Sequence, residues 1–99
     1  TATLTYFARG TYATGVGGGP AALDHGVYVS GSFDGFASST FYDKYIGASA
    51  SVTMAFSGGR IFTLTAGVTY VFKVLAAKWQ ASDTVTVDTI EVMLVAVQQ

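Results

Sequence analysis

The sequence contains no cysteine, one proline, one histidine and few charged residues. The absence of cysteine excludes disulfide bridges and thiolate chemistry, and a single histidine cannot anchor the three or four ligands of a zinc site. Charged residues make up 11% of the 99 residues, compared with ~25% in an ordinary soluble domain. A small domain exposes much surface, so this shortage indicates that neighbouring subunits cover part of it, while Thr, Ser and Gly cover the rest.

The net charge of −1 provides no basic patch, which argues against nucleic acid as a partner. No segment contains the ~18 apolar residues of a membrane span, and the N-terminus lacks the basic-then-apolar pattern of a secretory signal. Thr1 and Ala2 match what remains after removal of an initiator methionine. We therefore expect one complete domain, residues 1–99, made in a cytoplasm and associated with neither nucleic acid nor membrane; the alternative is a fragment processed from a longer precursor.

Short segments in which apolar and polar residues alternate predict an all-β fold. The clearest is residues 49–57, where every second residue from Ala50 to Phe56 is apolar and faces one side. The length of these segments, and the glycines between them, predict an antiparallel β-sandwich, most specifically a jelly-roll-like one. The other predicted strands are residues 3–8, 11–13, 26–33, 60–65, 68–77, 84–87 and 90–97.

The connections are predicted from residues that favour turns and loops. Hairpin turns are expected at Gly58-Gly59, Ala66-Gly67 and Asp34-Gly35, and a break in the first strand at Arg9-Gly10. Less regular segments are expected elsewhere: a single helical turn at residues 21–25, a structured loop or short strand at residues 41–47, and a bulge or bend at residues 88–89.

The last predicted strand, residues 90–97, is apolar on both faces from Val92 onward. A strand with one solvated face should alternate apolar and polar residues, so both faces of this strand require cover. We expect the chain's own second sheet to cover one face and a neighbouring subunit the other. The predicted oligomer interface combines this strand with outward-facing residues of segment 68–77, and consists of Val71, Leu75, Val92, Leu94, Val95 and Val97.

A glycine-rich segment, residues 15–20, is predicted to form a flexible surface loop. It lacks the Lys-Ser/Thr pair that follows the glycines of a phosphate-binding P-loop, and its glycines do not have dinucleotide-binding spacing. We therefore interpret it as a loop or arm that lies across a neighbouring molecule. The predicted partner contacts in this loop are Gly15, Gly17, Gly18, Gly19 and Pro20.

No group of residues in the sequence points to a particular reaction. His25 lies beside Asp24, but no serine occupies the Gly-x-Ser-x-Gly turn of a hydrolase, so His25 is interpreted as a solvated loop residue. Asp24, Asp34 and Asp43 lack the spacing of a calcium loop, and Asp88 and Glu91 are glycosidase candidates only because they are acidic. We therefore expect no enzymatic activity, no metal and no cofactor.

Several aromatic residues offer an alternative, a surface on which sugars or proteins would stack. The competing interpretation, in which they are ordinary core and rim residues of a sandwich, is favoured. The residues concerned are Tyr12, Tyr28, Tyr42, Tyr45 and Trp79.

Residues 60–70, Arg-Ile-Phe-Thr-Leu-Thr-Ala-Gly-Val-Thr-Tyr, resemble the strand–turn–strand of small trimeric jelly-roll modules in bacteriophage virion proteins. Those modules are similar to tumour necrosis factor-like and complement-globular-head-like jelly rolls. They often end in a strand like Ile90-Glu91-Val92-Met93-Leu94, and the Gly-x-Tyr strand of the wider group resembles Gly26-Val27-Tyr28. The resemblance implies a homotrimer in which the last strand lies near the three-fold axis.

Together these features favour a non-enzymatic virion structural protein, specifically a bacteriophage capsid decoration (cement) protein. Its expected partners are further copies of itself, as a homotrimer, and the major capsid protein. Its expected location is the virion, after synthesis in the host cytoplasm. The alternatives are a receptor- or carbohydrate-binding head of a phage tail or fibre, and a cellular lectin-like or filament-forming module.

Overall fold

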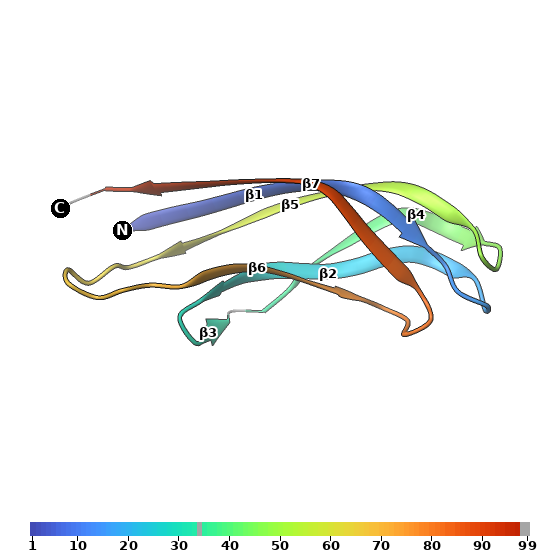
Figure 1. Cartoon of the computed structure of the whole chain (residues 1–99), viewed down its shortest axis with the longest axis horizontal. Helices are drawn as coiled ribbons and strands as arrows, with labels where there is room; N and C mark the ends of the chain where they lie inside the picture. Colours follow the sequence, from blue (N-terminus) through green and yellow to red (C-terminus); the bar gives the residue numbers. More distant parts are fainter. Residues whose placement is uncertain (34, 98–99) are drawn as a thin grey trace.

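The computed structural model describes residues 1–33 and 35–97, and these residues form two antiparallel β-sheets packed face to face (Figure 1). The predicted all-β antiparallel sandwich is therefore confirmed. Sheet A has the strand order β5-β1-β7, and in sheet B the central strand β2 pairs with β6 along one edge and with β3 and β4 along the other. The strands are β1 (Ala2–Ala13), β2 (Gly19–Val29), β3 (Ser32–Phe33), β4 (Ala37–Ile46), β5 (Ser51–Phe62), β6 (Phe72–Lys78) and β7 (Thr84–Ala96).

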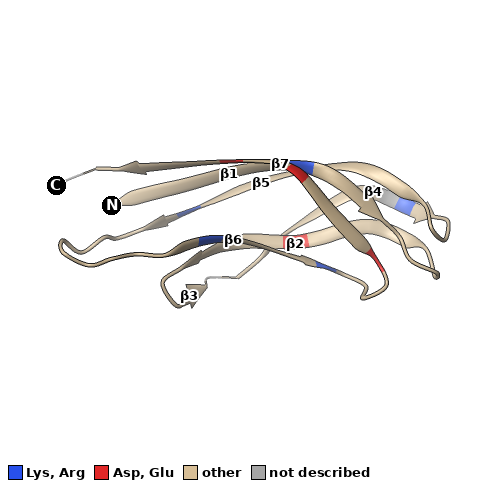
Figure 2. Ribbon diagram, viewed as in Figure 1, with Lys and Arg blue, Asp and Glu red and all other residues tan. Residues whose placement is uncertain are grey.

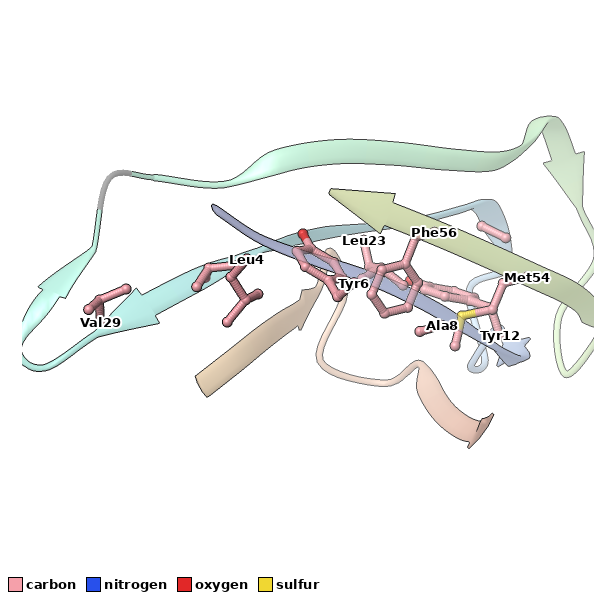
Figure 3. Packing of buried hydrophobic residues seen from close by; sticks show 10 residues of the cluster. Leu4, Tyr6, Ala8, Tyr12, Leu23, Val29, Met54 and Phe56 are labelled. Atoms are coloured by element: carbon pink, nitrogen blue, oxygen red, sulfur yellow. The ribbon is translucent and has the colours of Figure 1, made fainter. Parts of the chain in front are cut away.

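The core lies between the sheets and consists of every second residue of the central strands. In β1 the inward residues include Leu4, Tyr6, Ala8 and Tyr12, and these four are buried. Met54 and Phe56 of β5 pack against them, which confirms the face predicted for residues 50–56 (Figure 3). Sheet B contributes the buried side chains of Ala21, Leu23, Val27 and Val29.

The predicted hairpin turn at Gly58 and Gly59 is wrong, because β5 runs straight through both residues to Phe62. Gly58 lies opposite Tyr6 of β1, and a Cβ added to Gly58 would lie 2.5 Å from the Tyr6 hydroxyl oxygen. The glycine therefore makes room for the aromatic ring above it, as glycine often does in a strand interior. The return strand predicted at residues 60–65 is consequently the end of β5 and a loop, while the turn at Ala66-Gly67 is confirmed.

The predicted break at Arg9-Gly10 is also wrong, since β1 is continuous from Ala2 to Ala13. The irregularity belongs to β7, where Asp88 is the extra residue between the pairs Arg9–Thr89 and Gly10–Val87. The predicted bulge at residues 88–89 is thus confirmed. A Cβ at residue 10 would lie 1.8 Å from the Thr86 carbonyl oxygen, so the bulge requires glycine there.

The single helical turn predicted at residues 21–25 does not form. These residues belong to β2, where pairing with β4 and β6 outweighs the helix propensity of two alanines. The strand predicted over residues 26–33 is interrupted at Ser30 and Gly31, whose φ angles of 41° and 91° suit a tight hairpin turn. Segment 41–47 lies largely within β4, a strand of ten residues, and Asp34 of the predicted Asp34-Gly35 turn lies outside the described residues.

The molecule is elongated, with extents of 52 × 20 × 19 Å and a radius of gyration of 15.8 Å, compared with ~13 Å for a compact chain of this length. Along one side the sandwich is closed, because β5 packs on β2 and β4. Along the other side β7 and β6 make far fewer contacts with each other. We call this second side, between β7 of sheet A and β6 of sheet B, the open side.

Candidate assembly surface and buried polar clusters

Strand β7 is an edge strand with a long exposed apolar surface. Within the described ranges it pairs with β1 alone, so its other backbone edge has no strand partner. Such an edge is a template for pairing with another chain. Ile90, Val92, Met93, Leu94, Val95 and Val97 all expose between 45% and 61% of their surface. Charge is sparse along this strand, as Figure 2 shows, and Glu91 is the acidic residue of its C-terminal half.

The register of sheet A shows which β7 side chains face inward. Val92 lies opposite Tyr6 and Leu94 opposite Leu4, so both point toward sheet B, while Met93 and Val95 point away from it. Both sets are exposed. The prediction that the chain's own second sheet covers one face of residues 90–97 is therefore wrong: sheet B ends at β6 and covers neither face of that segment.

The predicted interface residues do not all lie together. Val92, Leu94, Val95 and Val97 are on or beside β7, but Val71 precedes β6 and Leu75 lies within it, on the other sheet. Leu75 pairs with Gly26, on the face of sheet B that points away from sheet A. The structure thus separates the predicted interface into two surfaces, of which the one on β7 is the larger.

The glycine-rich segment is more tightly packed than a free loop. Gly19 and Pro20 already belong to β2, and Gly18 and Gly19 are buried. The Gly15 N–H donates to Asp83, and the Tyr45 hydroxyl donates to the Gly17 carbonyl oxygen at 2.6 Å. Of the predicted partner contacts, Gly17 and Pro20 are exposed, and the neighbouring Val16 is 86% exposed. The surface that a partner can reach is therefore a tight turn around residues 16–17.

A chain of hydrogen bonds links Tyr6, His25 and Ser39 across three strands. His25 is 1% exposed, so its prediction as a solvated loop residue is wrong. Its Nδ1 lies 2.5 Å from the Tyr6 hydroxyl and its Nε2 lies 2.6 Å from the Ser39 hydroxyl. Burial lowers the pKa of His25 from its ordinary value, and the negative charge of Asp24 acts in the opposite direction.

The arrangement of Ser39, His25 and Tyr6 resembles the serine–histidine–carboxylate triad of hydrolases, with the tyrosine phenol in the place of the carboxylate. A cavity of about 290 Å³ adjoins Tyr6, His25 and Arg60, but Ser39 is not part of its lining. The Arg60 guanidinium donates to the Ser32 carbonyl at 2.7 Å and to the Ser32 hydroxyl at 3.0 Å, which ties β5 to β3. These contacts fix β1, β2, β3, β4 and β5 relative to one another.

A second buried cluster, around Asp83, ties the start of β7 to the end of β1. The Tyr12 hydroxyl donates to one carboxylate oxygen of Asp83, and the Gly15 N–H donates to the other at 2.9 Å. Burial and the Asp83 carboxylate raise the pKa of Tyr12 to about 12. Sequence reasoning missed this cluster because Tyr12 and Asp83 are far apart in the chain; the one available signal was that Tyr12 continues the even-numbered inward pattern of Leu4, Tyr6 and Ala8.

The aromatic residues proposed as a stacking surface are dispersed. Tyr12 is fully buried, and Tyr28 lies beneath the Lys73 ammonium at 5.4 Å from the ring centre. Trp79 is half exposed and its indole N–H donates to Asp24 at 3.2 Å. Tyr42 and Tyr45 belong to β4.

The comparisons with known proteins add nothing to this geometry. No known family, curated protein or solved structure matches the chain. Among the side chains that the structure describes, those of residues 1–33, 35–42 and 44–97, no three acidic, histidine or cysteine residues gather closely enough to hold a metal ion. The side chains of Asp34 and Asp43, two of the three aspartates considered for calcium, lie outside the described part. No helix in the described part of the chain is long and apolar enough to cross a membrane.

Proposed function

We propose that the protein is a non-enzymatic structural subunit of a bacteriophage virion, specifically a capsid decoration (cement) protein that acts as a homotrimer. The observation that carries the proposal is the exposed apolar surface of β7, because a soluble monomer seldom exposes so many large aliphatic side chains side by side. The resemblance of residues 60–70 to phage jelly-roll modules supplies the virion context. The proposed location is the virion, after synthesis in the host cytoplasm.

The proposed partner beyond the trimer is the major capsid protein. Capsid surfaces repeat one binding position many times, so a trimer gains avidity even where each contact is weak. Bound protein stabilises the assembled lattice by mass action, because it binds the lattice and not the free capsid subunit. This role needs a rigid body and exposed contact loops, and it needs no catalytic groups.

The test is to prepare particles of the encoding phage with and without this protein and to measure its copy number by quantitative mass spectrometry. We expect many copies per particle, in proportion to the capsid lattice, and particles that withstand heating better when the protein is present. A few copies confined to the tail would replace decoration with the receptor-binding head. Absence from virions would reject both.

A matched pair of variants tests whether the turn around residues 16–17 contacts the capsid. Val16→Glu is expected to weaken attachment at least about tenfold, because the side chain is 86% exposed and a charge there disturbs a contact without entering the core. Val68→Glu is the control and should attach normally, because Val68 is exposed in the loop between β5 and β6, and Figure 1 shows this loop at the opposite end of the body. Equal attachment by wild type and Val16→Glu would place the contact elsewhere.

A further inference from the structure

The open side of the sandwich exposes residues that point toward its interior. In sheet A each β1 residue lies beside a β7 residue on the same face, so the exposed fractions of the two side chains can be compared directly. Leu4 is 2% exposed beside Leu94 at 45%, and Tyr6 is 4% exposed beside Val92 at 54%. Ala8 is 0% exposed beside Ile90 at 49%. The inner face of sheet A is therefore buried up to β1 and uncovered at β7.

The uncovered residues form one surface, which we call the inner face of β7 and which consists of Val87, Ile90, Val92 and Leu94. It continues toward the start of β7 into a groove of about 470 Å³, whose lining includes the apolar residues Leu23, Ala76 and Val85 and the charged residues Lys78 and Asp83. None of the four residues of the inner face is charged, and Glu91 lies on the opposite face of the strand. The surface has no charge pattern that would select an oppositely charged partner.

The whole chain exposes more surface than a compact monomer of its mass. The chain exposes 5991 Å², whereas a compact monomer of 10.3 kDa would expose about 5,400 Å². The excess of about 600 Å², taken over the whole elongated chain, is of the same order as the ~800 Å² that each partner buries in a stable interface. Residues that lie at a symmetry axis meet their own copies, and an uncharged aliphatic surface placed there packs against a like surface without charge repulsion.

We propose that the inner face of β7 packs against the inner faces of further copies of this chain around the symmetry axis, so that the open sides of the copies share one apolar core. The proposal rests on the homo-oligomer of the proposed function and names the surface that forms it. Met93 and Val95, on the outer face of the same strand, then lie outside this shared core. The proposal is testable because it places neighbouring residues of one strand on opposite sides, one inside the shared core and the next outside it.

The first experiment compares Val92→Asp with Met93→Asp by sedimentation velocity over a range of protein concentrations. Both side chains are more than half exposed in the single chain, so either charge is compatible with a folded subunit, as circular dichroism will check. We expect Val92→Asp to weaken association at least about a hundredfold, because its charge would be buried without a partner, and Met93→Asp to associate like wild type. Loss of association in Met93→Asp but not in Val92→Asp would overturn the proposal.

The second experiment introduces no charge, and it exploits the absence of cysteine from the chain. Val92→Cys should form disulfide-linked dimers under mild oxidation, because residues near a shared axis approach their own copies, whereas Met93→Cys should not. Equal crosslinking of both variants, or crosslinking of Met93→Cys alone, would reject the inner face while leaving the homo-oligomer intact. A wild-type protein that sediments as a monomer at high micromolar concentration would instead reject the proposed homo-oligomer, and the inference with it.

Discussion

At the scale of single residues, two buried polar groups join strands that are distant in sequence. His25 bridges Tyr6 and Ser39, and Asp83 bridges Tyr12 and Gly15. A buried hydrogen bond to a satisfied partner stabilises the fold modestly, but removing one partner leaves the other without compensation. These clusters therefore contribute to specifying which strands meet.

The first prediction concerns His25 and acid. Its pKa in the folded protein is lowered by burial, so below about pH 6.5 the unfolded chain binds a proton that the folded chain excludes. The free energy of unfolding should consequently fall as the pH drops from 6.5 toward the pKa of the folded state. Thermal melts of wild type and His25→Gln between pH 5 and 8 will check this. In His25→Gln the free energy of unfolding should no longer show this part of the pH dependence. A pH dependence equal to that of wild type would contradict its assignment to His25.

The second prediction concerns Tyr12. Tyr12→Phe should lower the free energy of unfolding by about 1–3 kcal/mol, because the buried Asp83 carboxylate loses a donor. Wild type should also lose stability as the pH rises from 10 toward 12, since its folded state keeps the Tyr12 proton longer than the unfolded chain does. Urea unfolding is the measurement. Tyr45→Phe, which removes an exposed hydroxyl, is the control and should change stability by less than about 1 kcal/mol.

At the scale of elements, most strands could be predicted but several of the turns and breaks could not. Alternation over residues 50–56 identified the inward face of β5, and the polar pair at residues 88–89 located the bulge of β7. The turn at Gly58-Gly59 was predicted wrongly because a glycine in a hairpin turn and a glycine beneath an aromatic ring look alike in sequence. Only the pairing of Gly58 with Tyr6, contributed by a strand fifty residues away, distinguishes them.

The apolar composition of the candidate surface could be predicted from the sequence, but its position in the fold could not. Two-sided apolarity predicts that residues 90–97 require cover from outside the chain, and the single chain leaves both faces of this segment exposed. The sequence does not say where sheet B ends, so it assigned one face of β7 to the chain's own core. It also grouped Val71 and Leu75 with β7, because period-two alternation defines a face without saying which sheet carries it.

The third prediction tests the relation between Gly58 and Tyr6. Gly58→Ala should lower the free energy of unfolding by about 1–3 kcal/mol, because the new methyl group would displace a tyrosine that His25 holds in place. Gly47→Ala is the matched control, since a Cβ at that position would meet nothing within 4 Å. Chemical denaturation of both variants will check the difference. Equal effects would show that Tyr6 can move without cost.

At the scale of the whole molecule, the sandwich is closed along one side and open along the other. A single chain of this shape exposes core-facing side chains of β7 that a closed sandwich would bury. Its stability should therefore depend on association rather than on the chain alone.

The fourth prediction follows from that dependence. The melting temperature of wild type should rise with protein concentration, because association favours the folded state by mass action. The melting temperature of Val92→Asp should be independent of concentration over the same range. Scanning calorimetry at several concentrations is the measurement. A concentration-independent wild type would contradict the prediction.

The first and last described residues lie side by side at one tip of the body. The Val97 N–H donates to the Thr1 carbonyl oxygen at 2.9 Å, and Figure 1 places the N-terminus at the opposite end of the body from the loop between β1 and β2. A peptide fused at either end would leave the molecule at the same tip. If the turn around residues 16–17 rests on a capsid, that tip points into solution, and a cargo on either end would be displayed outward, across the long dimension of 52 Å.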